Sequence, residues 1–349
     1  MEVRVKTTSG IEDRSLTRRA ALATVVGGAV NGFGAAAERS VQSVTGEIPA
    51  AKLGVTLMHE HIVTDLRAPK ERQPGDYDPN EAFRAARPFL IALREAGCRT
   101  LVEPTPMHIG RDPATLQRLS EAVGINIICA TGVYGAANQR FIPDYARQET
   151  AEQLAERYVR EIREGIATTK VRPGFIKTGV NGQTPLPAIE RRLVQAALLA
   201  HKETGVTAAS HTAGGAQALE QLVIARELRI EPSHMIWVHA QNEKDQRIHR
   251  QAARDGMWVE FDGLREQSLD WHLSCVLAMA DAGLLHRTLI SHDAGWYRPG
   301  PEGGERYRGY TFVFEKFLPR LRAEGFSSEE IRQLLTANPA AALTGGLST

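Results

Sequence analysis

The feature that most constrains the fold of this chain is a regular alternation of short and long apolar patterns from residue 53 onward. Short segments rich in apolar and β-branched residues predict strands, and longer amphipathic segments between them predict helices. The predicted strands cover 54–61, 98–104, 125–132, 173–179, 206–211, 234–239, 257–263 and 288–293. The clearest helical patterns cover 80–97, 149–165, 186–205 and 215–229. This order predicts an α/β fold, a single (β/α)8 TIM barrel spanning 38–349, better than an open sheet.

The first 37 residues differ in composition from the rest. Arg18 and Arg19 precede an Ala/Gly/Val run that ends in Ala35, Ala36 and Ala37. This order of charged, modestly apolar and small residues resembles a twin-arginine export signal, and the run is too interrupted for a stable membrane span. We therefore expect 1–37 to direct export to the periplasm. The alternative is a disordered or helical extension on a cytoplasmic protein.

Charge and cysteine usage exclude several classes of partner. The 349 residues carry a formal net charge of +1, which offers no electrostatic footprint for nucleic acid or for an acidic membrane surface. The three cysteines, Cys98, Cys129 and Cys275, are far apart and lie in apolar context. They predict neither a disulfide framework nor a metal site, so we interpret them as core residues. A small-molecule partner is expected.

Polar residues end several of the predicted strands. His59 and His61 are one residue apart, so in an extended strand they share a face and Glu60 points away. The catalytic residues of a TIM barrel lie at the C-terminal ends of its strands. The residues that would meet there are His59, His61, Lys177, His211, His239 and Asp293. Four imidazoles, a carboxylate and a lysine suit zinc or a similar divalent ion.

Each of these residues has a simpler explanation when taken alone. His211 or His239 could be a hydrogen-bonded core histidine, Lys177 a lysine at the rim, and Asp293 a helix cap. Their coincidence at one end of the barrel favours a metal site. Histidines in or beside predicted helices, or at the start of a strand, receive no role: His201, His249, His272, His286 and His234. His292 is expected on the face of its strand opposite Asp293 and receives no role either.

The ordered motifs TLMHEH, IKTG, SHTAGG, VHAQ and SHD carry a family resemblance. Over residues 41–341 the chain resembles the phosphotriesterase family of the amidohydrolase superfamily. The resemblance implies a binuclear centre of two divalent ions, with Zn²⁺ the expected metal. Its implied ligands are His59, His61 and Asp293 on the buried metal, His211 and His239 on the exposed metal, and carboxylated Lys177 as a bridge.

The resemblance also implies a mechanism with a clear physical basis. A carbamate on Lys177 is an anionic oxygen ligand, which removes the cost of burying an ammonium. Two divalent ions lower the pKa of a bridging water, so that hydroxide is available at neutral pH. That hydroxide attacks a phosphorus or carbonyl centre, and Asp293 takes the proton.

The chain also departs from the family pattern. The best-studied organophosphate hydrolases of the family pass the proton outward through a histidine and a second acid. The position aligned with that acid is Asn242, which cannot ionise. Tyr134 occupies the place of a tyrosine that lies over the metals in relatives resembling lactonases. An ordinary core aromatic is the alternative for Tyr134.

Three further residues are candidates for substrate or metal contacts. Arg265 could hold a carboxylate or phosphate, or it could be a solvated surface arginine. Trp296 could form an apolar wall, or pack against the Gly-rich loop 296–310, itself a candidate lid. Glu103 ends the second strand and is a minor alternative as the bridging ligand.

These observations predict an exported metal-dependent hydrolase acting on a small-molecule ester. The expected substrate is a lactone or another carboxylic ester, with an organophosphate triester as a promiscuous substrate. The first alternative is an amidohydrolase acting on a small cyclic amide. The second is a non-catalytic phosphotriesterase-related binding protein. The resemblance leaves a homodimer open, and no interface patch is visible in the sequence.

Overall fold

The computed structural model describes residues 39–73 and 75–344 and confirms the predicted barrel. Eight parallel strands form a nearly closed sheet in the order β10-β9-β8-β7-β6-β5-β4-β3. Their bounds are β3 Thr56–Leu57, β4 Thr100–Glu103, β5 Asn126–Thr131, β6 Phe175–Val180, β7 Ala208–Thr212, β8 Met235–Val238, β9 Trp258–Phe261 and β10 Thr288–Ile290. The predicted export segment 1–37 lies outside the described residues, and its role stays a prediction.

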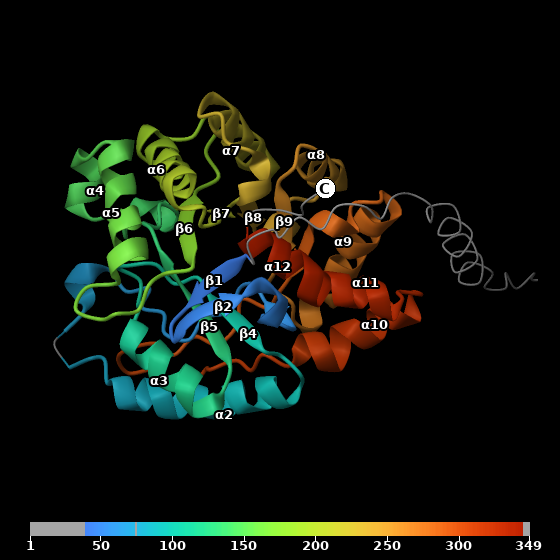
Figure 1. Cartoon of the computed structure of the whole chain (residues 1–349), viewed down its shortest axis with the longest axis horizontal. Helices are drawn as coiled ribbons and strands as arrows, with labels where there is room; N and C mark the ends of the chain where they lie inside the picture. Colours follow the sequence, from blue (N-terminus) through green and yellow to red (C-terminus); the bar gives the residue numbers. More distant parts are fainter. Residues whose placement is uncertain (1–38, 74, 345–349) are drawn as a thin grey trace, which may run out of the picture.

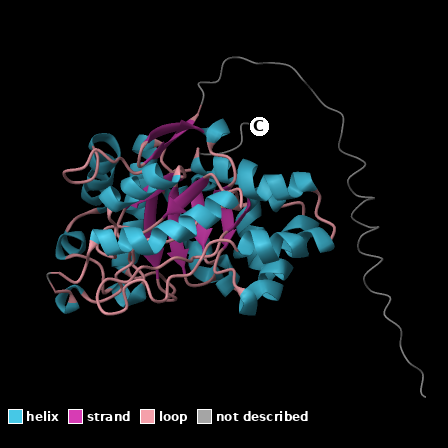
Figure 2. Ribbon diagram, turned by 90° about the horizontal axis from the view of Figure 1, so that it is seen from below, coloured by secondary structure: helices cyan, strands magenta, loops and turns pink. Residues whose placement is uncertain are grey.

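Helices surround this sheet, and all four predicted helical segments are confirmed. The α-helices of the described residues are α2 Pro79–Glu95, α3 Pro113–Val123, α4 Asp144–Gln148, α5 Ala151–Glu164, α6 Ala188–Thr204, α7 Gly215–Glu227, α8 Gln246–Arg254, α9 Leu269–Asp281, α10 Leu318–Ala323, α11 Ser328–Arg332 and α12 Asn338–Leu343. Figure 2 shows the strands enclosed by helices, with the long loops gathered toward one end. Within the described ranges, no helix has the length and apolar character needed to cross a membrane.

A hairpin that the sequence pattern did not predict lies before the first barrel strand. It consists of β1 Ser40–Ser43 and β2 Gly46–Pro49, paired antiparallel. The backbone N–H of Val44 donates to the carbonyl of Ile127 at 2.9 Å, one residue into β5. Because this contact lies near the start of β5, the hairpin covers the N-terminal end of the barrel, and in Figure 1 it lies over the barrel centre together with α12. The opposite end is left for loops.

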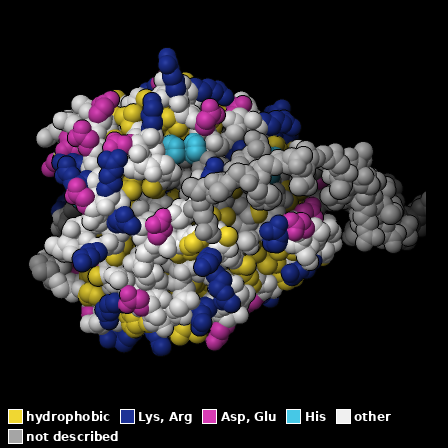
Figure 3. Space-filling model, viewed as in Figure 1, with side chains coloured by type: hydrophobic (Ala, Val, Ile, Leu, Met, Phe, Trp, Pro, Cys, Tyr) yellow, Lys and Arg dark blue, Asp and Glu magenta, His cyan; other side chains and the backbone are white. Residues whose placement is uncertain are grey.

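The core is divided between the inside and the outside of the barrel. One buried cluster fills the interior and includes Met58, Ile128, Phe175 and Trp258. The larger cluster packs the helices against the outer face of the strands. On the face shown in Figure 3, Lys and Arg side chains are interspersed with Asp and Glu, in keeping with the small net charge. The rigid barrel therefore serves as a scaffold for residues at its loop end.

Candidate metal centre

The barrel is closed by the segments that carry three of the predicted ligands. β3 ends at Leu57, so His59 and His61 lie just beyond the strand and not within it as predicted. The backbone N–H of Asp293 donates to the carbonyl of His59 at 3.0 Å. The N–H of His61 donates to the carbonyl of Ala294 at 2.8 Å. Closure of the barrel thus brings residues from its first and last strands together.

Glu60 holds this seam from the opposite face, as its place between the two histidines predicted. Its side chain is fully buried. It accepts hydrogen bonds from the hydroxyl of Ser291 at 2.8 Å, from the backbone N–H of His292 at 2.8 Å, from His292 Nδ1 at 2.6 Å and from the N–H of Ala294 at 2.9 Å. His292 therefore faces away from Asp293, which confirms the prediction for its side chain.

His59, His61 and Asp293 converge on one point. The Nε2 atoms of the two histidines are 3.3 Å apart. Asp293 Oδ1 lies 3.3 Å from His61 Nε2 and 3.9 Å from His59 Nε2. Asp293 adopts a left-handed backbone with φ of 52°, a conformation uncommon for residues other than glycine. The chain thus accepts a costly backbone conformation at the residue that completes this group.

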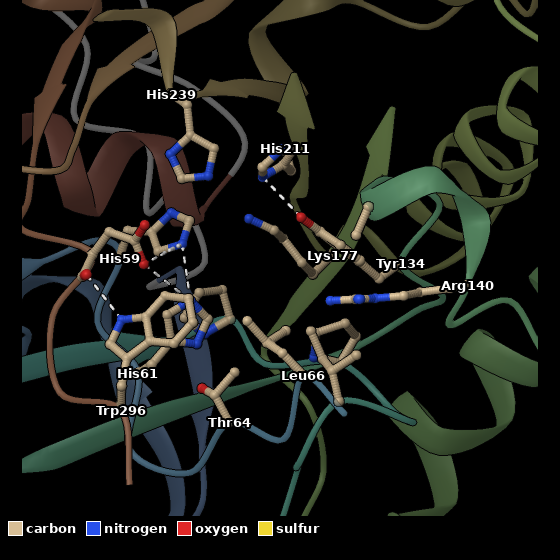
Figure 4. A pocket seen from close by; sticks show the side chains of 15 residues that line it. His59, His61, Thr64, Leu66, Tyr134, Arg140, Lys177, His211, His239 and Trp296 are labelled. Atoms are coloured by element: carbon tan, nitrogen blue, oxygen red, sulfur yellow. Dashed lines mark hydrogen bonds and ion pairs between the residues drawn. The ribbon is translucent and has the colours of Figure 1, made fainter. Parts of the chain in front are cut away.

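His211, His239 and Lys177 complete the group from neighbouring strands. The ring centroids of His211 and His239 are 4.4 Å apart, and those of His59 and His239 are 5.1 Å apart. Lys177 lies in β6 with only 2 % of its surface exposed. Figure 4 shows its amine pointing toward the histidines. All six predicted ligands therefore lie around one space.

A buried carboxylate that the sequence analysis missed orients two of these histidines. Asp262 follows β9 and has no exposed surface. It contacts His239 Nδ1 through a short hydrogen bond and lies 3.3 Å from His59 Nδ1. An ionised carboxylate can only accept, so both Nδ1 atoms carry a proton, and in the neutral imidazole form this leaves Nε2 with the lone pair that a metal needs. The FDG ending of the seventh predicted strand was the available signal.

His61 is oriented by a different pair of residues. The hydroxyl of Thr105 lies 2.6 Å from His61 Nδ1 and donates its proton to Glu103 Oε1. It must therefore accept the proton of His61 Nδ1, which again leaves Nε2 free. The other oxygen of Glu103 accepts from the backbone of Thr105 at 3.2 Å. Both Glu103 oxygens are thus engaged away from the ligand group, which favours Lys177 over Glu103 as the bridging ligand.

Burial and neighbouring charges together shift the pKa values of the candidate ligands. Burial lowers the pKa of Lys177 to about 8, despite the nearby carboxylates of Glu260 and Asp262. Burial opposes protonation of His59, but Asp262 and Glu260 outweigh it and raise the pKa of His59 to about 9. Burial likewise opposes ionisation of Asp293, but the imidazoles of His61 and His59 lower its pKa to about 2. A lysine with a depressed pKa has more neutral amine to react with CO₂.

The residues present fit a bound divalent metal. Ligand atoms of His59, His239 and Asp293 all lie within 4.8 Å of one another. Asp293 Oδ1 is buried and accepts no well-aligned hydrogen bond from the described residues, although imidazole nitrogens lie close. A buried carboxylate oxygen without a hydrogen-bond donor is costly unless a cation neutralises it. Imidazole nitrogen and carboxylate oxygen are the donors that zinc prefers in catalytic sites.

The six residues form the floor of a pocket. The pocket is also lined by Thr64, Leu66, Pro104, Pro106, Ile109, Tyr134, Ala137, Arg140 and Trp296 (Figure 4). Tyr134 Oη lies 3.0 Å from His211 Nδ1, and the Trp296 ring lies 5.0 Å from the His61 ring. Both residues thus lie beside the ligand group, as the sequence analysis expected, and their contact with a substrate stays a prediction.

Two other predicted positions lie outside this lining, and one lining residue was missed. Arg265 is exposed and is not among the residues that line the pocket, so its substrate contact also stays a prediction. Asn242 ends a short 3-10 turn, Ala240–Asn242, and does not line the pocket either. Arg140 lines the pocket, although no sequence pattern marked it, because it comes from a loop and not from a strand end.

Comparisons with known proteins give a consistent result. The sequence profile of the phosphotriesterase family matches residues 39–343. An aryldialkylphosphatase from Saccharolobus solfataricus is 28 % identical over 306 residues, covering 84 % of this chain and 95 % of that protein. The human N-acetyltaurine hydrolase is 25 % identical over 347 residues, covering 87 % of this chain and 97 % of that protein. A mutant of a PTE-like lactonase from Deinococcus radiodurans superposes with a TM-score of 0.78 at 30 % identity, covering 87 % of this chain and 99 % of that one.

Proposed function

This chain belongs to the phosphotriesterase family, and we propose that it is a metal-dependent hydrolase whose main substrate is a lactone or another carboxylic ester. Hydrolysis of organophosphate triesters would be a promiscuous activity of the same site. The observation that carries the proposal is the convergence of six potential ligands on one pocket floor, from β6 and β7 and from the segments that directly follow β3, β8 and β10. Core packing alone would not bring four histidines, a lysine and an aspartate from different strands to one point.

We assign the metal ligands as the resemblance implied. His59, His61 and Asp293 would hold one ion, His211 and His239 the other, and carboxylated Lys177 would bridge them. Two such ions, when bound, would supply hydroxide at neutral pH and polarise the scissile carbonyl or phosphoryl group. Zn²⁺ is the proposed metal because the free donors are imidazole nitrogens and carboxylate oxygens.

The chain's own residues would position the substrate and move the proton. Asp293 keeps 23 % of its side-chain surface exposed in the pocket, and its lowered pKa leaves it ionised at neutral pH. It can therefore accept the proton from the attacking water. Tyr134 and Trp296 would border the bound ester on two sides.

The position of Asn242 bears on the route of the proton. A shuttle through a second acid at that position is not available, because Asn242 cannot ionise and does not line the pocket. The proton of the attacking water therefore has no outward route through that residue. This leaves a lactone or another carboxylic ester open as the main substrate and does not select between them.

The activities for which the relatives are named support hydrolysis and leave one rival. One relative is named for phosphate ester cleavage and a structural neighbour for lactone cleavage. The human relative is named for hydrolysis of N-acetyltaurine, which is an amide. Hydrolysis of an amide is therefore the second candidate function, since the same nucleophile attacks either carbonyl.

A direct test compares an ester with its matching amide on the zinc-loaded chain. We expect kcat/KM for γ-butyrolactone to exceed that for γ-butyrolactam by about 100-fold or more, with weaker turnover of a diethyl aryl phosphate. The Asp293→Asn variant serves as the control for background hydrolysis. Faster turnover of the lactam would favour the amidohydrolase, and no turnover of any of the three would favour a binding protein.

A further inference from the structure

We propose that the substrate carries a negatively charged group and that Arg140 binds it on the wall of the pocket. The group would be a carboxylate, phosphate or sulfonate on a compact ester. This inference rests on the proposed hydrolase function, because it names the substrate class of that same site.

The charges on the pocket wall support this proposal. Fifteen residues line the pocket, and six of them are the proposed ligands, which leaves nine. Arg140 is the one charged side chain among those nine, and no carboxylate other than Asp293 lines the pocket in the described residues. The pocket with its open mouth holds about 570 Å³ of space. A negatively charged substrate group would therefore have Arg140 as its one charged partner on the wall.

The guanidinium of Arg140 is available to pair with a substrate. Its interaction within the described residues is with the Phe141 ring, whose centroid lies 4.8 Å from the guanidinium carbon, and no carboxylate pairs with it. By contrast, Arg111 pairs with Glu161, and Arg157 pairs with Glu149. Figure 4 shows the Arg140 guanidinium entering the pocket between Tyr134 and Leu66.

The backbone before Arg140 is anchored, so the guanidinium starts from a fixed point. Residues 137–139 all adopt left-handed φ angles of 52°, 56° and 61°. The backbone N–H of Asn138 donates to Asn181 Oδ1 at 3.0 Å, and Gln139 Nε2 donates to Glu190 Oε1 at 2.8 Å. Glu190 lies on α6 and is fully buried. This anchorage lowers the entropy lost when Arg140 binds an anion.

The chemistry of the guanidinium defines the group that it would recognise. Its planar fork matches two oxygens of a carboxylate, phosphate or sulfonate. Four apolar wall residues, Leu66, Pro104, Pro106 and Ile109, suit a short apolar linker between this group and the ester. A small lactone with an anionic side arm fits both features better than a lactone with an uncharged alkyl chain.

The test uses two lactones on the zinc-loaded chain. One carries a carboxymethyl group on a five-membered ring, and the other carries a propyl group of similar size. We expect Arg140→Met to raise KM for the carboxymethyl lactone by about 10- to 100-fold, because it removes a charge-assisted hydrogen bond. The kcat of Arg140→Met for the carboxymethyl lactone should change by less than about threefold, because the lost contact binds the substrate and the transition state equally. For the propyl lactone, neither kcat nor KM should change by more than about threefold.

Arg118→Met is the matched control. Arg118 also rests on a phenylalanine, with its guanidinium carbon 4.9 Å from the Phe83 ring centroid, and it does not line the pocket. Arg118→Met should leave both substrates unaffected. Equal changes for the two lactones in Arg140→Met, or no change for the charged one, would overturn the inference.

A binding experiment separates this inference from the proposed function. Cyclopentanones carrying the same two side arms have no scissile ester, and calorimetry can measure their affinity for the zinc-loaded chain. We expect the carboxymethyl compound to bind about tenfold more tightly than the propyl compound, and Arg140→Met to abolish the difference. If the difference persists in Arg140→Met, the anion is held elsewhere and the inference fails. If this binding result holds but neither lactone is hydrolysed, only the proposed function fails.

Discussion

At the scale of single residues, the candidate ligands depend on partners that do not reach the pocket. Asp262 contacts Nδ1 of both His59 and His239, and Thr105 contacts Nδ1 of His61. In the neutral form of each ring, the contact at Nδ1 leaves the Nε2 atom to bind a metal. Such partners in the layer behind the ligands fix ring orientation and raise ligand basicity. The site is therefore prepared by at least two layers of side chains.

Asp262→Asn tests this dependence. The amide can donate to Nδ1 of His239, which would move the ring proton to Nε2, the atom needed for the metal. We expect zinc affinity to fall by about 10- to 100-fold, measured by competition with a chromogenic chelator. Asp270→Asn is the control, because the Asp270 side chain is 86 % exposed in the first turn of α9. Unchanged zinc affinity in Asp262→Asn would show that the histidines bind without this support.

The sequence was informative about the ligands and much less so about their surroundings. The six ligands were predictable because each lies at or near the end of a predicted apolar strand, and the barrel brings strand ends together. Asp262 was missed although it also ends a strand, because its role depends on which rings face it across the barrel. Arg140 was missed because its place on the wall depends on the path of a loop.

At the scale of the elements, the barrel closes between β3 and β10, its two shortest strands. β3 has two residues and β10 has three, so the ladder between them is replaced by contacts beyond the strands. The backbone bonds between 59–61 and 293–294 and the four bonds accepted by Glu60 perform this role. The seam and the candidate metal centre thus share one segment of chain.

Substitution of Glu60 should weaken the whole barrel. Glu60→Ala would leave four buried donors without an acceptor, and we expect the free energy of unfolding to fall by about 3–5 kcal/mol. Urea denaturation at a fixed zinc concentration measures this change. The milder Glu60→Gln keeps one acceptor oxygen and should lose less. Glu95→Ala, at an exposed position of α2, should stay within about 0.5 kcal/mol. A loss of stability that small in Glu60→Ala would contradict the role of Glu60 in holding the seam together.

The elements themselves were largely predictable from the sequence. Hydrophobic periodicity located all eight barrel strands and the four helices with the clearest patterns, because burial on both faces of a parallel strand leaves a continuous apolar run. The extent of the first strand was wrong, since His59 and His61 lie beyond its end. The hairpin 40–49 was missed because its strands are short, half exposed and outside the repeating pattern.

At the scale of the whole molecule, the barrel places its two ends in different roles. The hairpin β1–β2 and α12 cover the N-terminal end, while the ligand group and its pocket lie where the strands end. Residues from five strands would coordinate the proposed metals, so metal binding should link distant parts of the chain. The homodimer that the family resemblance leaves open stays open.

The central claim is that this chain holds a binuclear metal centre bridged by Lys177. The most direct measurement is the metal content per chain by elemental analysis, on protein purified without chelator and on its Lys177→Ala variant. We expect about two divalent ions per chain in the unsubstituted protein and loss of most of them in the variant, because the bridge contacts both ions. Absence of metal from the folded, unsubstituted protein, with no uptake of added zinc, would contradict the account. Full metal content in Lys177→Ala would refute the bridge alone.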